Sequence, residues 1–220
     1  MINNRCVVGV EWLRQNYIDC RDRIKGRLHE FKTIAIERDE ERALCELIFC
    51  LLTPQSKAKL CWRAVESICK KYNTLQCSRS EILGELYGVR FRYKKSIYVY
   101  EAIRRFIDNG EFRIIERLAD FNSAESARDW LVTNIKGLGY KEASHFLRNI
   151  GMGDDIAILD RHILRNLMRY GVIDSIPTYL SKKRYIDIED KMRLFSKNIG
   201  IPMSHLDLLF WYIETSELFK

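Results

Sequence analysis

The chain has 220 residues, of which 47% are hydrophobic and 30% charged, a composition that excludes an intrinsically disordered protein. Lys and Arg number 37 against 30 Asp and Glu, which gives a net charge of +7. This balance suits a polyanionic partner such as nucleic acid, although many basic proteins bind none. The longest apolar stretch, residues 43–52, is interrupted by Glu46 and is far shorter than the roughly 20 residues of a membrane-spanning helix. With no signal-peptide pattern at the start, we expect an intracellular protein that is neither secreted nor membrane-bound.

Apolar residues recur at helical spacing along the chain, first in the segment 44–51 and again in 102–106 and 163–168. Sustained alternation of apolar and polar residues is missing, so we predict an all-α protein with no significant sheet. Pro54 should end the first of these helices at Thr53.

Serine residues mark two further helix starts. Ser78 precedes Glu81 at the spacing of a capping box, and Asn122-Ser123 stands before an apolar segment. We therefore predict that one helix begins after Ser78 and another after Ser123.

The cysteines are confined to the first 77 residues and form no C-x-x-C motif. Without a secretion signal, we expect them to be reduced and mostly buried thiols. They are Cys6, Cys20, Cys45, Cys50, Cys61, Cys69 and Cys77.

Residues 131–147, LVTNIKGLGYKEASHFL, carry the most informative pattern. Gly137 and Gly139 flank Leu138, which allows the chain to reverse between two helices with the leucine anchored in the core. The second helix would begin with unbonded N–H groups and a positive dipole end, which together form an anion site. We expect Gly137, Leu138, Gly139 and the preceding Lys136 to bind a DNA phosphate, independently of base sequence. The alternative is an ordinary glycine turn between helices.

Lys141 follows this turn, and Asp160 lies 160 − 141 = 19 residues later. The intervening residues can finish a helix, turn at 151–155 and return the chain toward the lysine. An unprotonated amine can attack C1′ of a deoxynucleotide, and a carboxylate can stabilise the positive charge that develops on the sugar. We therefore predict that Lys141 and Asp160 are catalytic. The simpler alternatives are an exposed, phosphate-binding lysine and an aspartate that caps the following helix.

Residues 131–165 resemble the helix-hairpin-helix DNA glycosylase superfamily. Lys141 in G-L-G-Y-K stands where the members with strand-cleaving activity keep their nucleophile, and Asp160, His162 and Arg165 match the D-x-H-x-x-R motif. The strings KGLGYKEASHFLRNIG and AILDRHILR are similar to the compact archaeal and bacterial class of 8-oxoguanine DNA glycosylase/lyase.

This resemblance implies a two-lobed fold with the active site in the cleft between the lobes. We expect residues 41–155 to form the lobe that carries the hairpin, and 1–40 with 156–220 to form the other. The implied activity is base-excision repair. The enzyme would flip out and excise 8-oxoguanine through a lysine Schiff base, and then cleave the strand by β-elimination. The expected partner is damaged double-stranded DNA, bound by a monomer in the cytoplasm at the nucleoid.

Four further positions fit the resemblance. Gln55 corresponds to the residue that fills the gap left by a flipped base, and Phe91 to an aromatic residue that packs against that base. Trp211 and Lys220 lie nine residues apart, as do a tryptophan and the terminal lysine near the base pocket in this class. The alternatives are a polar helix end for Gln55, core packing for Phe91 and a frayed terminus for Lys220.

No cysteine follows Cys77, so the C-terminal iron–sulfur cluster of the endonuclease-III-like relatives cannot form. We expect no required cofactor and no metal site, and consider only a monovalent cation at the hairpin. Basic residues interleaved with aromatic ones suit a DNA-lining surface. They form the clusters Lys57, Lys59 and Arg63; Arg90, Arg92, Lys94 and Lys95; and Lys182, Lys183 and Arg184.

Three alternative functions remain open from the sequence. The first is a glycosylase/lyase for another damaged base. The second is a non-catalytic helix-hairpin-helix module that only binds DNA, and it leaves the Lys141–Asp160 spacing to coincidence. A protein–protein scaffold would explain neither the basic clusters nor the hairpin.

Overall fold

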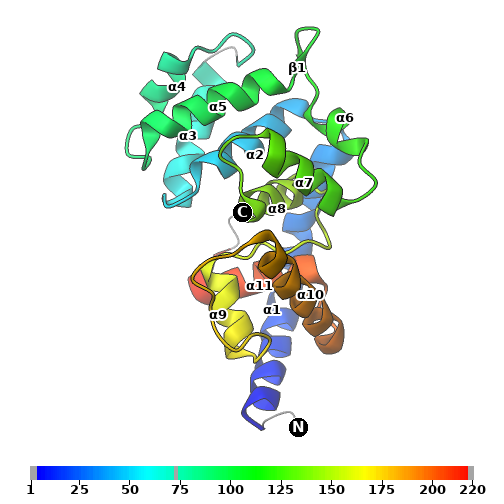
Figure 1. The fold of residues 1–220 in the computed structure, drawn as a ribbon. Coiled ribbons are helices and arrows are strands. Elements are labelled where there is room, and N and C mark those ends of the chain that lie inside the picture. Colours follow the sequence, from blue (N-terminus) through cyan, green and yellow to red (C-terminus); the bar gives the residue numbers. More distant parts are fainter. Residues whose placement is uncertain (1–3, 72–73, 218–220) are drawn as a thin grey trace. The chain divides into compact units, whose positions relative to one another are not determined.

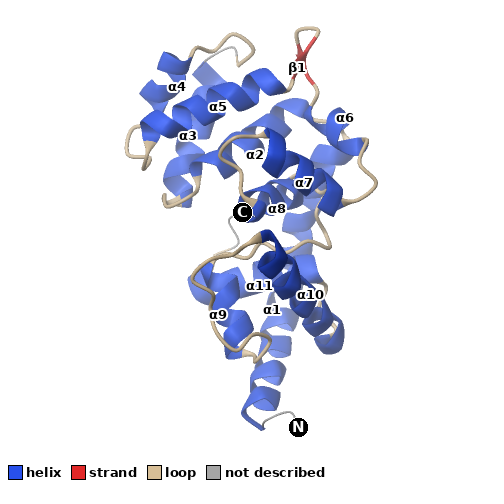
Figure 2. Ribbon diagram, in the orientation of Figure 1, coloured by secondary structure: helices blue, strands red, loops and turns tan. Residues whose placement is uncertain are grey.

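A computed structural model describes residues 4–71 and 74–217, with side chains from Gly9 onward. Helices dominate the described part of the chain (Figures 1 and 2), as the helical spacing of its apolar residues predicts. The elements are α1 (Asn4–Ile36), α2 (Glu40–Leu52), α3 (Ala58–Lys71), α4 (Arg79–Glu85), α5 (Arg92–Arg105), β1 (Ile107–Asp108), β2 (Glu111–Phe112), α6 (Ile114–Ala119), α7 (Ala124–Asn134), α8 (Tyr140–Asn149), α9 (Arg161–Arg169), α10 (Lys182–Ile199) and α11 (Met203–Thr215).

The chain divides into two compact units. The terminal unit comprises Met1–Phe31 and Gly153–Lys220, and the middle unit comprises Lys32–Met152. The first division falls inside α1, which continues without a break from one unit into the other. A helix that crosses a division leaves no turn or linker signal in the sequence, and the division expected from the family resemblance lies at 40/41.

Helix α2 is the centre of the middle unit. Asp39 caps its start by accepting a hydrogen bond from the N–H of Arg42 at 2.9 Å, and Thr53, directly before Pro54, caps its end. Nine of its thirteen residues are buried, because α3, α5, α6 and α8 all pack against it. The carboxylate of Glu40 also accepts hydrogen bonds from the first N–H groups of α6.

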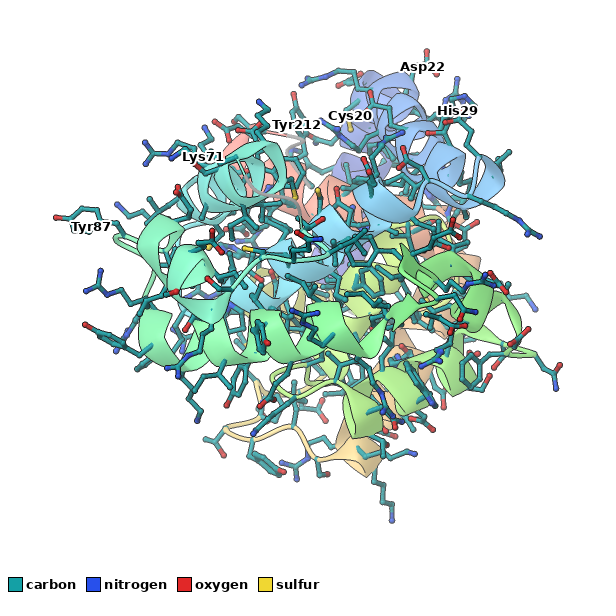
Figure 3. All side chains as sticks on the ribbon, turned by 90° about the horizontal axis from the view of Figure 1, so that it is seen from above. Cys20, Asp22, His29, Lys71, Tyr87 and Tyr212 are labelled. Carbon is teal, nitrogen blue, oxygen red and sulfur yellow. The ribbon has the colours of Figure 1, made fainter. Side chains whose placement is uncertain are left out.

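Both predicted helix starts are confirmed. Ser78 and Glu81 form a reciprocal capping box at the start of α4, and Ser123 forms the same arrangement with Ser126 at the start of α7. At the other end of the α4 segment, Glu85 pairs at 3.0 Å with Lys71 of α3, whose side chain is labelled in Figure 3. This ion pair joins α3 to α4, and the two helices also pack against each other.

The prediction of no significant sheet holds, apart from one short hairpin. Strand β1 pairs antiparallel with β2, with Ile107 opposite Phe112. Asn109 and Gly110 form the turn with φ angles of +50° and +81°, the left-handed conformations that an Asn-Gly hairpin turn requires. This dipeptide is the sequence signal that identifies the hairpin.

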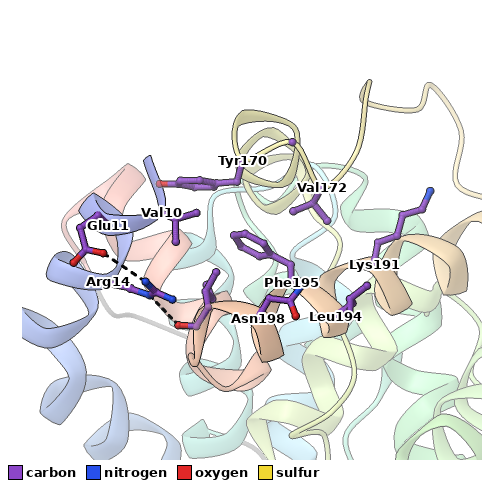
Figure 4. A pocket seen from close by; sticks show the side chains of 11 residues that line it. Val10, Glu11, Arg14, Tyr170, Val172, Lys191, Leu194, Phe195 and Asn198 are labelled. Carbon is purple, nitrogen blue, oxygen red and sulfur yellow. Dashed lines mark hydrogen bonds and ion pairs between the residues drawn. The ribbon is translucent and has the colours of Figure 1, made fainter. Parts of the chain in front are cut away.

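In the terminal unit, α10 and α11 pack together, and α11 also packs on α9. The ring of Tyr170 stacks on those of Phe195 and Phe210, with centroids 5.9 and 5.8 Å away. Beside Tyr170 lies a mostly apolar pocket of about 510 Å³ (Figure 4). At its edge Arg14 of α1 donates a hydrogen bond to the carbonyl oxygen of Ile199 at 3.2 Å.

None of the helices in the described part of the chain is long and apolar enough to cross a membrane. The cysteine prediction holds for the six described thiols, none of which is in a disulfide. Four are buried and two half-buried: Cys20, Cys50, Cys61 and Cys77, and then Cys45 and Cys69.

Candidate active site

The predicted hairpin joins α7 to α8 in the middle unit. Gly137 has a φ of +98°, and a Cβ atom there would lie 2.4 Å from Cδ2 of Tyr98 in α5. Only glycine fits this position, because an L side chain would be strained and would also overlap the tyrosine ring. Leu138 is buried and donates its N–H to the carbonyl of Ile135 at 3.2 Å, so it anchors the turn as predicted.

Gly139 is the N-cap residue of α8 and offers no side chain to cap the helix. Its backbone is extended, with φ −95° and ψ −178°, a conformation that other residues also adopt. The start of α8 therefore combines the positive end of a helix dipole with an uncapped first turn, the arrangement that binds anions. The preceding Lys136 is exposed, and its ammonium lies 3.7 Å from the Glu101 carboxylate.

Lys141 is the second residue of α8 and is half-buried. Among the described residues, its ammonium has no hydrogen-bond or salt-bridge partner. Burial raises the pKa of the Cys50 thiol of α2, and the Glu46 carboxylate raises it further, whereas the positive charge of Lys141 acts in the opposite direction. Lys141 therefore lies near Cys50, where α8 packs against α2.

Three of the predicted site residues line one pocket of the middle unit. Gln55, Phe91 and Gly137 border a space of about 320 Å³, together with Lys94 and Tyr98 of α5; we call this space the hairpin pocket. Gln55 and Phe91 both have left-handed backbones, with φ angles of +56° and +60°. Left-handed backbones are uncommon in residues other than glycine, and they cluster at functional sites.

Phe91 is 52% exposed, so the alternative of core packing is wrong for this residue. The guanidinium of Arg90 lies 5.0 Å from the centre of its ring. An exposed aromatic ring with an adjacent cation is suited to stacking on a base.

The prediction that the basic clusters face DNA is wrong for Lys95. Its sequence neighbours indicate a DNA-facing lysine, yet it is only 4% exposed. Its ammonium donates hydrogen bonds to the carbonyls of Leu52 and Pro54 and to the hydroxyl of Ser56, at 2.6, 2.7 and 3.0 Å. Burial lowers the pKa of this lysine. Lys95 therefore holds the loop that presents Gln55, a role that basic residue type alone does not reveal.

Asp160 lies in the terminal unit and is the N-cap of α9. Its Oδ1 accepts hydrogen bonds from the N–H groups of His162 and Ile163, both at 2.8 Å. Asp160 therefore caps α9, as the simpler alternative predicts, and a capping aspartate can also be catalytic. Because Lys141 belongs to the middle unit, the approach of Asp160 to Lys141 stays a prediction.

The segment that leads into Asp160 is anchored by α10. Tyr185 donates its hydroxyl to the carbonyl of Ala157 at 2.6 Å and accepts the N–H of Leu159 at 3.2 Å. The buried carboxylate of Glu189 accepts the N–H of Ala157 at 2.6 Å. These contacts fix the backbone before Asp160, and the sequence contains no local signal for them because the partners are 26 to 32 residues apart.

His162 and Trp211 meet at the contact of α9 and α11. Their rings are 5.0 Å apart and nearly perpendicular, and Nδ1 of His162 lies 4.0 Å from the Glu214 carboxylate. Nε1 of Trp211 is buried without a hydrogen-bond acceptor in the described part of the chain. Arg165 is exposed on α9, and the predicted base-pocket residue Lys220 lies outside the described residues.

Comparisons with known proteins place this geometry in a family. A family model described as 8-oxoguanine DNA glycosylase, of the helix-hairpin-helix type, matches residues 24–201. The 8-oxoguanine DNA glycosylase/AP lyase of Fusobacterium nucleatum is 43% identical over 205 residues, which cover 93% of this chain and 94% of that protein.

Two solved structures of Methanocaldococcus jannaschii 8-oxoguanine DNA glycosylase superpose on this chain. One covers 97% of both chains with a TM-score of 0.86 and 37% identity. The other is a complex with a 15mer DNA containing 8-oxoguanine, and it covers 97% of this chain and 100% of that chain, with a TM-score of 0.86 and 36% identity. The chain therefore belongs to the helix-hairpin-helix 8-oxoguanine DNA glycosylase family.

Proposed function

We propose that this chain excises 8-oxoguanine from double-stranded DNA and then cleaves the strand at the same nucleotide, with Lys141 as the nucleophile. The observation that carries the proposal is the place of Lys141. It stands on the first turn of a helix that begins uncapped after the glycine hairpin, and its ammonium is unpaired among the described residues. The family relatives named for this activity support the choice of lesion.

The hairpin is proposed to hold the damaged strand. The extended Gly139 and the uncapped first turn of α8 would bind a phosphate through backbone N–H groups. Lys136 would add a charge at the same place, in competition with its exposed partner Glu101. Contacts of this kind position the duplex without reading its sequence.

The chemistry follows from a strand held in this position. The ammonium of Lys141 first gives up a proton, the resulting amine attacks C1′ of the flipped nucleotide, the glycosidic bond breaks, and the base leaves with the bonding electron pair and takes up a proton. The sugar ring opens to an imine between C1′ and Lys141. The imine acidifies the C2′ hydrogen, and loss of that proton expels the 3′ phosphate, which cleaves the strand.

Asp160 is proposed to stabilise the positive charge on the sugar during base loss. The two N–H groups that bind its Oδ1 hold the carboxylate in a fixed orientation. Preorganised charge of this kind costs no rearrangement during the reaction. Gln55 would fill the space that the flipped nucleotide leaves, because Lys95 fixes its loop at the edge of the hairpin pocket.

Trp211, Lys220, Phe91 and the motif residues His162 and Arg165 are proposed to serve the base pocket or its support. The buried Nε1 of Trp211 is a hydrogen-bond donor that lacks an acceptor in the described part of the chain, and such a donor suits a polar base edge. No cofactor enters these steps. The one ion considered is a monovalent cation at the hairpin. We propose a monomer that acts on cellular DNA in the cytoplasm.

Borohydride trapping tests the proposal. Full-length protein is mixed with a duplex that contains one 8-oxoguanine opposite cytosine, and borohydride reduces any imine to a stable protein–DNA bond. We expect an adduct with the wild type and with the control variant Lys70→Gln, which changes an exposed lysine of α3 outside the hairpin, and none with Lys141→Gln. Lys141→Gln should also lose base excision while it still binds the duplex.

Each contrary result has a distinct meaning. An adduct with Lys141→Gln would show that another amine is the nucleophile. Base excision by the wild type without an adduct would overturn the imine chemistry. Tight binding with neither excision nor an adduct would favour another damaged base or a non-catalytic module, and a panel of lesion-bearing duplexes would separate these two.

A further inference from the structure

Two thiols of the middle unit touch across the packed helices α2 and α3. The sulfur atoms of Cys45 and Cys69 lie 2.6 Å apart. Three other thiols of the described chain donate instead to backbone carbonyls, namely Cys20 to Asn16, Cys61 to Leu52 and Cys77 to Ser78. The Cys45–Cys69 pair therefore differs from these thiols in having sulfur as its partner.

The geometry brings the pair close to bonding. A disulfide has an S–S distance of about 2.05 Å, so the two sulfur atoms need to approach by only about 0.5 Å. The cysteines sit on two helices that already pack together, and they are 24 residues apart. Both are half-buried, which gives access to a small oxidant.

We propose that Cys45 and Cys69 are an oxidation site and form a reversible intramolecular disulfide when the protein meets a hydroperoxide. The proposal does not depend on the proposed function, because neither thiol lines the hairpin pocket. Disulfides of intracellular proteins are typically transient and redox-sensing.

The reaction has two balanced steps. The Cys69 thiolate attacks one oxygen of hydrogen peroxide, the O–O bond breaks, and Cys69 becomes a sulfenic acid while hydroxide leaves with the electron pair. The Cys45 sulfur then attacks the Cys69 sulfur, the S–O bond breaks, and the oxygen leaves as water with the Cys45 proton. Peroxide is reduced to two waters in total, and two thiols are oxidised to one disulfide.

Cys69 suits the first step and Cys45 the second. The hydrogen bond with Cys45 lowers the pKa of the Cys69 thiol, against the opposing effects of burial and of Glu41, and the thiolate is the reactive form. A partner thiol in contact captures the sulfenic acid before a second peroxide can oxidise it to sulfinic acid.

The bond would also join the two helices that flank the Gln55 loop. Cys45 stands in the first half of α2 and Cys69 near the end of α3, with the loop between them. Such a cross-link restricts the unfolded chain. Oxidation is therefore expected to raise the midpoint of thermal unfolding by several degrees.

The test uses reduced full-length protein treated with a small molar excess of hydrogen peroxide and then with an alkylating reagent. We expect the intact mass of the wild type to fall by two hydrogen atoms, with two fewer alkylated thiols. Dithiothreitol should restore both. Cys45→Ser and Cys69→Ser should not show this change. The matched control is Cys77→Ala. Burial and Glu81 raise the pKa of the Cys77 thiol, and nearby Cys69 adds to this, but we expect that variant to behave as the wild type.

Peptide mapping without reduction identifies the bond. Trypsin should release residues 43–57, which contain Cys45 and Cys50, linked to residues 64–70, which contain Cys69. Fragmentation within the first peptide separates Cys45 from Cys50. A link through Cys50 or Cys77 would overturn the proposal. So would separate oxidation of the thiols to sulfinic acids, or full retention of both thiols in folded protein.

Discussion

The starts of helices α8 and α9 differ in whether a side chain binds their first N–H groups. Every helix begins with N–H groups that have no partner within the helix, at the positive end of its dipole. At the start of α9, the carboxylate of Asp160 accepts two of these N–H groups. At the start of α8, Gly139 offers no side chain, and in the described part of the chain no side chain caps this helix, although Glu142 places a carboxylate in its first turn.

At α9 the N–H groups are bound by a side chain of the same protein. At α8 they remain available to an external anion. The closed start of α9 fixes a negative charge in one orientation, which is useful for a group that stabilises a developing positive charge. The open start of α8 leaves room for a phosphate beside Lys141. Substitutions at three positions, Asp160, Gly137 and Gly139, test whether this difference matters.

The largest effect is expected from Asp160→Asn, which removes the charge but keeps the cap. Asparagine caps helices about as well as aspartate, so the free energy of unfolding should change by less than about 1 kcal/mol. Excision of 8-oxoguanine should slow by about 100-fold or more, because the sugar cation loses its stabilising charge. Single-turnover excision and urea unfolding of the same preparation measure the two effects.

The control is Asp160→Ala, which removes both the charge and the cap. It should slow excision to a similar extent and also lower the free energy of unfolding by about 1 kcal/mol relative to Asp160→Asn. A near-normal excision rate for Asp160→Asn would leave Asp160 as a helix cap only.

The next largest effect is expected from Gly137→Ala, which disturbs the turn before the open helix start. Its Cβ would meet the Tyr98 ring at 2.4 Å, at a φ of +98°. We expect a loss of about 2 kcal/mol in the free energy of unfolding and weaker binding to duplex DNA. Urea unfolding and fluorescence anisotropy with a labelled duplex measure these losses.

Gly110→Ala is the matched control, because Gly110 has a φ of +81° and open space around its Cβ position. Its free energy of unfolding should fall by only about 1 kcal/mol, because alanine is strained at a positive φ but meets no neighbouring atom there. This variant should bind DNA normally. Equal losses from the two variants would mean that the Tyr98 contact is unimportant.

Local sequence signals were enough to predict the helices, including the starts of α8 and α9. The glycines around Leu138, the serine caps and the aspartate before an apolar helical pattern each act through neighbours a few residues away. Their geometry is therefore visible in a short window of sequence. The Asn109-Gly110 turn was equally local, and the short hairpin that it forms was nevertheless not predicted.

Long-range contacts could not be predicted in this way. Lys95 looks like its basic neighbours in the sequence, but only the packing of α5 against α2 turns its ammonium toward the Leu52 and Pro54 carbonyls. The anchoring of the Asp160 segment by Tyr185, and the contact of Cys45 with Cys69, likewise join residues more than 20 positions apart. The predicted approach of Lys141 to Asp160 also joins residues far apart in the sequence, and it stays a prediction.

The smallest effect on stability comes from closing the open helix start. Gly139→Asn and Gly139→Asp would place a capping side chain on α8, like the one on α9, at a backbone conformation that both residues adopt. A new Cβ would lie 3.0 Å from a Glu142 carboxylate oxygen, which can move because it ends a flexible side chain. Each variant should gain a few tenths of a kcal/mol in the free energy of unfolding.

Binding to duplex DNA should nevertheless weaken in both variants, because the new side chain occupies the N–H groups that would bind a phosphate. Gly139→Asp should weaken it more than Gly139→Asn, and added salt should reduce this difference, since only the aspartate repels phosphate. Anisotropy titrations at two salt concentrations separate the two contributions. If both variants bind as tightly as the wild type, the open start of α8 does not hold the DNA backbone, and the difference between the two helix starts has no role in binding.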